Sequence, residues 1–260
     1  MADYLKIFAT KQDYDNYIAA DYPRPNVSFI EETDEVIYTN YQLPEYILDG
    51  IRSSNWSGNE FVKASQYIGR IYIPEGVETV ADHACEGSLN LEFVKFPSTL
   101  VSIGVEALFS CPKLDNVILP DSLETINDAA FEQCISLSNI KFGKNITDIT
   151  YRSFAECSSL QSVDLPEALE TLGKSAFEGC TNLETVVIHA AVTSIGDNAF
   201  IDDSSLTSLT VEATTPPTLG EDALQGTHAD LEIFVPADSV NTYKAAAGWS
   251  TYASQIFPIA

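Results

Sequence analysis

The sequence predicts an α/β solenoid, a right-handed superhelix with a parallel β-sheet on its concave face and short turns or 3-10 segments on its convex face. A small α+β N-terminal domain precedes it. Three observations predict this fold: a 23-residue repeat, triplets of alternating apolar positions inside each repeat, and a proline after most triplets. Residues 1–65 do not fit the repeat. We therefore expect an N-terminal domain or cap at 1–65 and a repeat domain with a helical C-terminal cap at 66–260.

The N-terminal residues carry signals for one helix and one hairpin. The amphipathic stretch 10–22 begins at Thr10, a residue type that caps helices, and is followed by Pro23, which ends them. Two apolar runs, 27–30 and 36–39, flank an acidic segment and predict a hairpin. The chain starts without the basic leader and long apolar run of a signal peptide. It is therefore expected at the cell surface or secreted if a leader was removed, and otherwise in the cytoplasm.

The repeat is defined by a column of leucines spaced 23 residues apart. Further apolar columns keep the same period. A single coil of this length cannot bury its own apolar columns, and stacking brings each column onto its neighbour, which is typical of a solenoid. The leucine column consists of Leu91, Leu114, Leu137, Leu160, Leu183 and Leu206.

Each repeat also contains a triplet that predicts a β-strand. In residues 94–96, for example, Val94 and Phe96 point inward and Lys95 points outward, as the pleat of a strand requires. Eight such triplets predict eight parallel strands and a curved sheet about 34 Å long. The proline that follows most triplets ends the strand, because it has no amide hydrogen to donate. The remaining segment of each repeat is short and predicts a single helical or 3-10 turn.

The C-terminal residues predict a cap for the last coil. The stretch 237–247 reads as a helix with Asp238 or Ser239 as its N-cap, and Gly248 ends it. Trp249 is placed to cover the last coil. Because a solenoid exposes an apolar column at its end, capping is the favoured role of this segment.

The columns occur in a fixed order within each coil. One coil reads Leu114-Asp-Asn-Val-Ile-Leu-Pro120, then Leu123-Glu-Thr-Ile126, then Ala130-Phe131-Glu-Gln-Cys134. This order resembles the BspA-type leucine-rich repeat, and the tail from Ile233 to Trp249 resembles the end of such arrays. The resemblance implies a leucine-rich-repeat superhelix. It also implies a bacterial or protist protein of the cell surface or a secreted one, some of which act as adhesins for host proteins.

Composition excludes several classes of partner. The 260 residues include 38 acidic and 13 basic side chains, for a net charge of −25. Binding to nucleic acid or to an anionic membrane needs clustered lysine and arginine, so neither partner is expected. No stretch approaches the roughly 20 apolar residues of a membrane-spanning helix, so membrane insertion is not expected.

No pattern in the sequence predicts an enzyme, a cofactor or a metal site. Four of the five cysteines form one repeat column, and none forms a CxxC pair, so buried free thiols are favoured over disulfides and zinc ligands. The three histidines, His83, His189 and His228, fall at different repeat positions and are expected in solvated loops. Asp203 replaces the column cysteine beside Asp202. We interpret the pair as part of a solvated acidic face, with a local opening of the core or weak divalent-ion binding as alternatives.

The outward positions of the strands are the remaining candidate site. Solenoids often bind partners on the concave face, and exposed apolar residues there favour binding, although β propensity along a parallel ladder also explains them. We expect a non-enzymatic module that binds a protein, including a host extracellular protein. The alternative is a structural spacer or phage-associated component that displays the N-terminal domain. The candidate residues are Tyr72, Phe93, Lys95, Asn116, Ile118, Asn139, Lys141, Ser162, Asp164, Thr185, Val187 and Thr210.

Overall fold

The computed structural model describes residues 69–73 and 75–259, together with four short strands that precede them. The first two of these, β1 (Val27–Ile30) and β2 (Glu35–Tyr38), pair antiparallel, as the hairpin prediction requires. The helix predicted at 10–22 lies outside the described residues. The division at residue 65 therefore stays a prediction.

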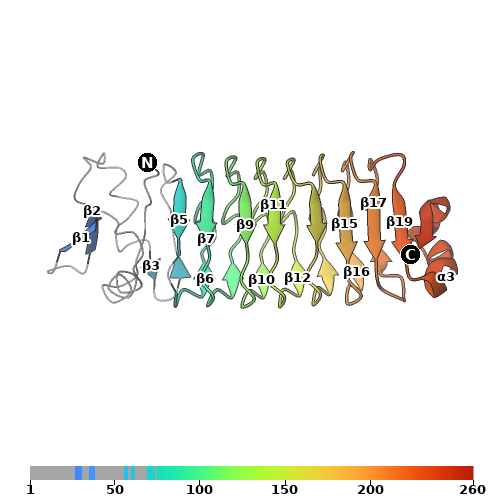
Figure 1. Cartoon of the computed structure of the whole chain (residues 1–260), viewed down its shortest axis with the longest axis horizontal. Helices are drawn as coiled ribbons and strands as arrows, with labels where there is room; N and C mark the ends of the chain where they lie inside the picture. Colours follow the sequence, from blue (N-terminus) through green and yellow to red (C-terminus); the bar gives the residue numbers. More distant parts are fainter. Residues whose placement is uncertain are drawn as a thin grey trace.

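The described repeats form a parallel β-solenoid of about eight turns (Figure 1). Each turn contributes one longer strand to the first row of strands. All eight predicted strands are present, and those from β7 to β19 contain the alternating burial that the triplets predict. They are β5 (Arg70–Tyr72), β7 (Phe93–Lys95), β9 (Asn116–Ile118), β11 (Asn139–Lys141), β13 (Ser162–Asp164), β15 (Thr185–Ile188), β17 (Ser208–Val211) and β19 (Glu232–Val235).

The first row is interrupted, where the sequence predicted one continuous sheet. Strands β5 to β11 form a four-stranded sheet, and β13 to β19 form a second sheet with the C-terminal strand β20 (Ile256–Pro258). The coil that ends the first part also departs from the repeat pattern. Gly143 stands where neighbouring coils have proline, and Phe142 is half-buried although its column is buried in the adjacent coils. Its ring packs edge-on against Phe154, with 5.5 Å between ring centroids.

A second sheet, which the sequence analysis missed, runs along the same solenoid. Its strands have two residues each, and from β6 to β16 the second residue of each strand is apolar and buried. The parallel order is β4-β6-β8-β10-β12-β14-β16-β18, with β3 antiparallel at its end. The strands are β3 (Trp56–Ser57), β4 (Glu60–Phe61), β6 (Thr79–Val80), β8 (Ser102–Ile103), β10 (Thr125–Ile126), β12 (Asp148–Ile149), β14 (Thr171–Leu172), β16 (Ser194–Ile195) and β18 (Thr218–Leu219).

Tight turns, and no helix, connect the second sheet to the next coil. The helical alternative for these segments is wrong, and the described repeats are β-solenoid turns and not α/β units. Each turn has two residues in the left-handed region, such as Glu106 (φ 52°) and Ser110 (φ 53°). The turn backbones also hydrogen-bond between coils, as from the Phe131 amide to the Ser153 carbonyl at 2.8 Å. This ladder satisfies backbone groups that packing would otherwise leave buried without partners.

Stacked columns fill the core between the two sheets. The rings of Phe131, Phe154, Phe177 and Phe200 are parallel to within 11°, with centroids 5.2, 5.3 and 5.7 Å apart. All five cysteines are buried and free, as the column position predicted. In four of them Sγ contacts a carbonyl of the preceding coil, for example Cys134 Sγ to the Leu108 oxygen at 3.3 Å.

The C-terminal cap is present but its helix is shorter than predicted. A 3-10 turn, η2 (Ala237–Ser239), leads into α3 (Val240–Ala245), and a second 3-10 segment, η3 (Trp249–Gln255), follows. Ser239 occupies the N-cap position of α3, one of the two positions predicted, but its side chain makes no capping hydrogen bond there. Ser239 Oγ instead donates to the Thr214 carbonyl at 2.7 Å. Trp249 is fully buried and its indole nitrogen donates to the Pro217 carbonyl at 2.8 Å, which confirms its capping position.

Candidate functional site

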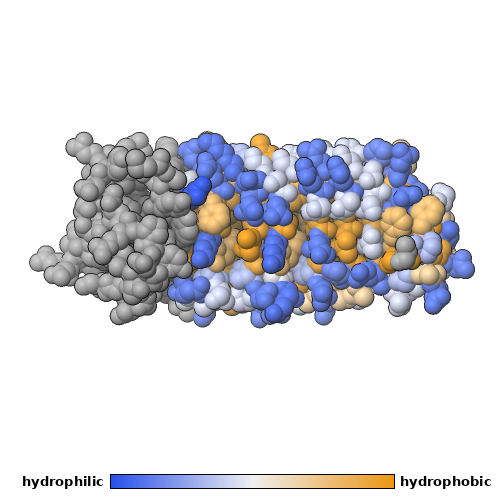
Figure 2. Space-filling view, in the orientation of Figure 1, coloured by the Kyte–Doolittle hydropathy of each residue, from blue (hydrophilic) through white to orange (hydrophobic). Residues whose placement is uncertain are grey.

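The predicted site residues lie together along the first row of strands. We call the outward positions of β5 to β19 the strand face. Register pairs such as Tyr72 with Lys95 and Lys141 with Ile118 bring equivalent residues of adjacent coils side by side. Figure 2 shows, in the view of Figure 1, a band of hydrophobic residues along the solenoid between hydrophilic ones.

Most of the predicted residues are solvent-exposed, as a binding surface requires. Ile118 is the most exposed large hydrophobic residue of the described chain, with 59% of its surface accessible. Phe93, Val187 and Thr210 are half-buried. The side chain of Tyr72 lies outside the described residues. The exposed members are Lys95, Asn116, Ile118, Asn139, Lys141, Ser162, Asp164 and Thr185.

A shallow groove of about 570 Å³ opens beside the first three strands of this face. Two of its residues, Phe93 and Asn116, were predicted. Arg70 lies in the same outward column as Phe93 but was not among the candidates, and the other residues were missed because they lie next to the triplets. Glu92, Lys113 and Asp115 are exposed on loops, and the groove is thus a mixed-charge surface with one aromatic side. Its lining residues are Arg70, Glu92, Phe93, Lys113, Asp115, Asn116 and Ser136.

His189 was predicted to lie in a solvated loop, and this prediction is wrong. The residue follows β15 on the strand face, and its ring nitrogens contact Glu212 Oε2 at 2.8 Å and Asp164 Oδ1 at 2.9 Å. Partial burial lowers the pKa of His189, but the hydrogen bonds and charges of Glu212 and Asp164 outweigh burial and raise it above its ordinary value. His189 thereby joins three successive strands of the second half of the face.

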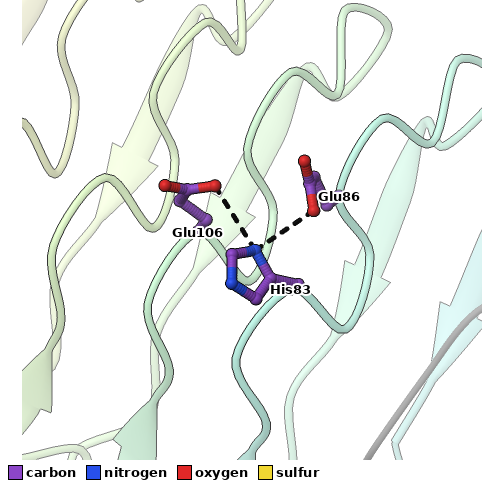
Figure 3. A group of neighbouring side chains, drawn as sticks. All are labelled: His83, Glu86 and Glu106. Atoms are coloured by element: carbon purple, nitrogen blue, oxygen red, sulfur yellow. Dashed lines mark ion pairs between the residues drawn. The ribbon is translucent and has the colours of Figure 1, made fainter.

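A second histidine cluster lies on the turns, away from the strands. His83 Nδ1 is 3.1 Å from Glu86 Oε2 and 3.3 Å from Glu106 Oε2 (Figure 3). All three side chains are at least one-third exposed. One imidazole nitrogen and two carboxylate oxygens form a donor set that a divalent transition metal accepts, with water in the remaining positions. The 23-residue spacing of His83 and Glu106 was the only signal in the sequence for this neighbourhood.

Asp203 is fully buried, which overturns its interpretation as part of a solvated acidic face; among the described residues Glu132 is the other buried carboxyl, with 9% of its surface accessible. Asp203 Oδ1 accepts a hydrogen bond of 2.7 Å from the Cys180 amide, and Oδ2 has no partner. Burial raises the pKa of Asp203 well above its usual range, and the nearby carboxylates of Asp202 and Glu178 add to this effect. Asp203 thus continues the cysteine column into the next coil.

No helix among the described residues is long and apolar enough to cross a membrane.

A search of curated proteins finds no match to the chain. Solved structures do match. A leucine-rich repeat protein of T. pallidum superposes with a TM-score of 0.57 at 25% identity, over 75% of this chain and 82% of that one.

Two further bacterial structures show the same fold at lower identity. A leucine-rich cell surface protein of Faecalibacterium prausnitzii matches with a TM-score of 0.58 at 21% identity, over 82% of this chain. A leucine-rich repeat protein of Eubacterium ventriosum matches with a TM-score of 0.59 at 19% identity, over 78% of this chain. The chain spans 54% and 50% of the lengths of these two proteins.

The family model that matches describes a BspA-type leucine-rich repeat region. It matches in six copies over residues 31–114, 55–158 and 102–229, which is well over half of the chain. The matched residues contain the leucine, phenylalanine and cysteine columns that build the stacked core. The chain belongs to the BspA-type leucine-rich repeat family.

Proposed function

We propose that the chain is a non-enzymatic protein-interaction module that binds its partner through the strand face. The observation that carries the proposal is the row of outward residues on stacked coils, which includes at least one exposed side chain on every strand from β7 to β15. Repeat solenoids present such faces to extended partners. A face of this length offers the area that specific protein interfaces bury, about 800 Å² on each partner.

We further propose that the module acts at a bacterial cell surface or after secretion, as an adhesin-like protein for host extracellular proteins. One similar structure is described as a cell surface protein, which supports this setting. If the sheet lies on the concave side of a right-handed superhelix, as the sequence predicts, the strand face is the surface a partner would enter.

Steric variants test the binding face without changing its charge. Asn116→Trp and Asn139→Trp place bulky side chains on exposed positions of β9 and β11, and we expect the double variant to lose binding to partners found by screening purified host extracellular proteins. Thr181→Trp and Ser204→Trp form the matched control. Both are exposed on the turns, in the repeat column where other coils already have Leu89 and Ile135 exposed. Equal binding by both double variants would exclude the strand face.

The setting is tested separately, by fractionating source cells into cytosol, envelope and medium and detecting the protein by mass spectrometry. We expect it in the envelope or the medium. A cytosolic or phage-particle location would contradict the adhesin proposal and favour a spacer that displays the N-terminal domain.

A further inference from the structure

The first half of the strand face has a charge opposite to that of the chain. The eight outward positions of β5 to β11 include no acidic residue, although the chain has 38 acidic and 13 basic side chains. The corresponding positions of β13 to β19 include Asp164 and Glu232. The basic half of the face therefore coincides with the four-stranded sheet. By strand register these positions are held by Arg70, Tyr72, Phe93, Lys95, Asn116, Ile118, Asn139 and Lys141.

Two lysines of this half have no ion-pair partner within residues 69–73 and 75–259. Lys95 and Lys141 are both exposed, and the ion pairs of that part of the chain include neither of them. Other cations of the solenoid do pair. Lys144 Nζ lies 2.8 Å from Asp121 Oδ2, and Arg152 contacts three glutamates. The charges of Lys95 and Lys141 are thus available to a ligand.

An exposed apolar residue lies between these two lysines. The register pairs Ile118 with Lys141, and the pairing of Phe93 with Asn116 brings Lys95 opposite Ile118 on the other side. Adjacent strands are about 4.8 Å apart, so the two lysines are about 10 Å apart along the solenoid axis with Ile118 midway. Ile118 has 59% of its surface accessible.

We propose that this half of the strand face binds an acidic segment of the partner protein, with two carboxylates on Lys95 and Lys141 and an apolar side chain on Ile118. The inference rests on the proposed function and names the chemistry of its partner. An α-helix that carries an acid, an apolar residue and an acid at i, i+3 and i+7 spaces its carboxylates by about 10.5 Å. That spacing matches the lysines when the helix lies along the solenoid axis.

The net charge of the chain does not prevent such binding. At physiological ionic strength the screening length is about 8 Å, so carboxylates on the turns are screened while a carboxylate in contact with a lysine is not. The charge of the whole chain lowers the association rate for an acidic partner, and the local lysines govern how long the complex lasts. The complex therefore weakens when salt is raised.

The test uses an alanine-rich helical peptide with glutamate, leucine and glutamate at the stated spacing, labelled for fluorescence anisotropy. We expect the full chain to bind it, and Lys95→Glu with Lys141→Glu to weaken binding by about tenfold or more. The control, Lys174→Glu with Lys244→Glu, makes the same change in net charge away from the strand face and should bind as the unmodified chain does. Ile118→Ala should weaken binding severalfold with little change in salt dependence. Thermal unfolding verifies that each variant folds.

Three results would overturn the inference. The first is no binding up to about 1 mM peptide, which corresponds to a binding free energy of about −4 kcal/mol. The others are an equal loss of peptide binding in both double variants, and tighter binding of a peptide with lysines in place of the glutamates. These results leave the proposed function intact if a protein partner is still lost with Asn116→Trp and Asn139→Trp. If the tryptophan variants leave partner binding unchanged, the proposed function fails, whatever the peptide does.

Discussion

The backbone amide of Cys180 donates a hydrogen bond of 2.7 Å to Asp203, the residue that takes the place of cysteine in the following coil. Elsewhere in this column a thiol contacts a carbonyl of the preceding coil, as Cys180 Sγ contacts the Phe154 oxygen at 3.3 Å. Asp203 therefore holds a polar, titratable group at a position where the other coils hold an apolar one. The substitution makes the solenoid sensitive to pH at one point of its core.

Asp203→Cys should stabilise the protein at neutral and alkaline pH. Burial raises the pKa of Asp203 in the folded state above its unfolded value, so its contribution to stability is complete below about pH 4 and is lost as pH rises through the folded pKa. At pH 8 the variant should exceed the unmodified protein by about 1–3 kcal/mol, the cost of a buried group without a partner. Urea unfolding at several pH values measures the difference.

Asp203→Asn is the control for that prediction, because it removes the charge and keeps an oxygen for the Cys180 amide. At neutral pH the Asp203→Asn variant should have a larger free energy of unfolding than the unmodified protein, and this difference should also shrink as pH falls toward 4. A difference that is constant with pH would show that Asp203 does not change its protonation state on folding.

The five thiols should resist modification in the folded protein. All five are buried, and burial raises the pKa of Cys85, Cys134, Cys157 and Cys180, so little thiolate is present and reagents cannot reach it. A thiol-reactive dye at pH 8 should label none of them in buffer and all five in denaturant. Rapid labelling of any cysteine without denaturant would show that its coil opens locally.

Phe154→Ala should destabilise the solenoid by about 3–5 kcal/mol, because the residue is buried between two stacked rings. Phe154→Leu should cost less than about 1.5 kcal/mol if the neighbouring side chains repack. Guanidinium unfolding measures both. Phe142→Ala is the comparison, because this half-buried ring packs edge-on against Phe154. It should lower the free energy of unfolding by less than half as much as Phe154→Ala does. Equal losses would contradict the conclusion that the stacked rings form the centre of the core.

His189→Gln should reduce stability below about pH 6.5 and have little effect above the folded pKa. Because the folded pKa of His189 is raised, its stabilising contribution is present below the unfolded value and is lost as pH rises. The contribution should stay within about 1 kcal/mol, since the group is partly solvated. The difference in unfolding free energy between variant and unmodified protein, measured from pH 5 to 9, gives the profile. A difference that grows with pH would contradict the contacts with Asp164 and Glu212.

Stacking made much of the fold predictable. The leucine column, the triplets and the cysteine column each repeat every 23 residues, and the structure buries or exposes them as the period requires. The second sheet was missed because a two-residue strand such as Thr125–Ile126 contains one inward and one outward residue, too few to show alternation. The turns were misread because two left-handed residues per coil, most of them not glycine, carry no mark in the sequence.

The candidate site was predictable only in part, for a related reason. Alternation identifies outward residues such as Ile118, but it does not tell which neighbours converge on them. Glu92 and Lys113 of the groove, and the contacts of His189 with residues of the neighbouring coils, depend on how loops pass from one coil to the next. Asp203 could have been predicted from its column, which is buried in the other coils, although aspartate is a residue type that is mostly exposed.

The interruption between β11 and β13 has a mechanical consequence. On that side of the solenoid no strand pairing joins the two coils, while on the other side β10, β12 and β14 pair without a break. A change of angle between the two halves there would break no strand-to-strand hydrogen bond of the first row. The two coils are held together there by the continuous second sheet, by the hydrogen bond of 2.8 Å from the Phe154 amide to the Ala176 carbonyl and by the stacked rings of Phe154 and Phe177, and not by the strand face.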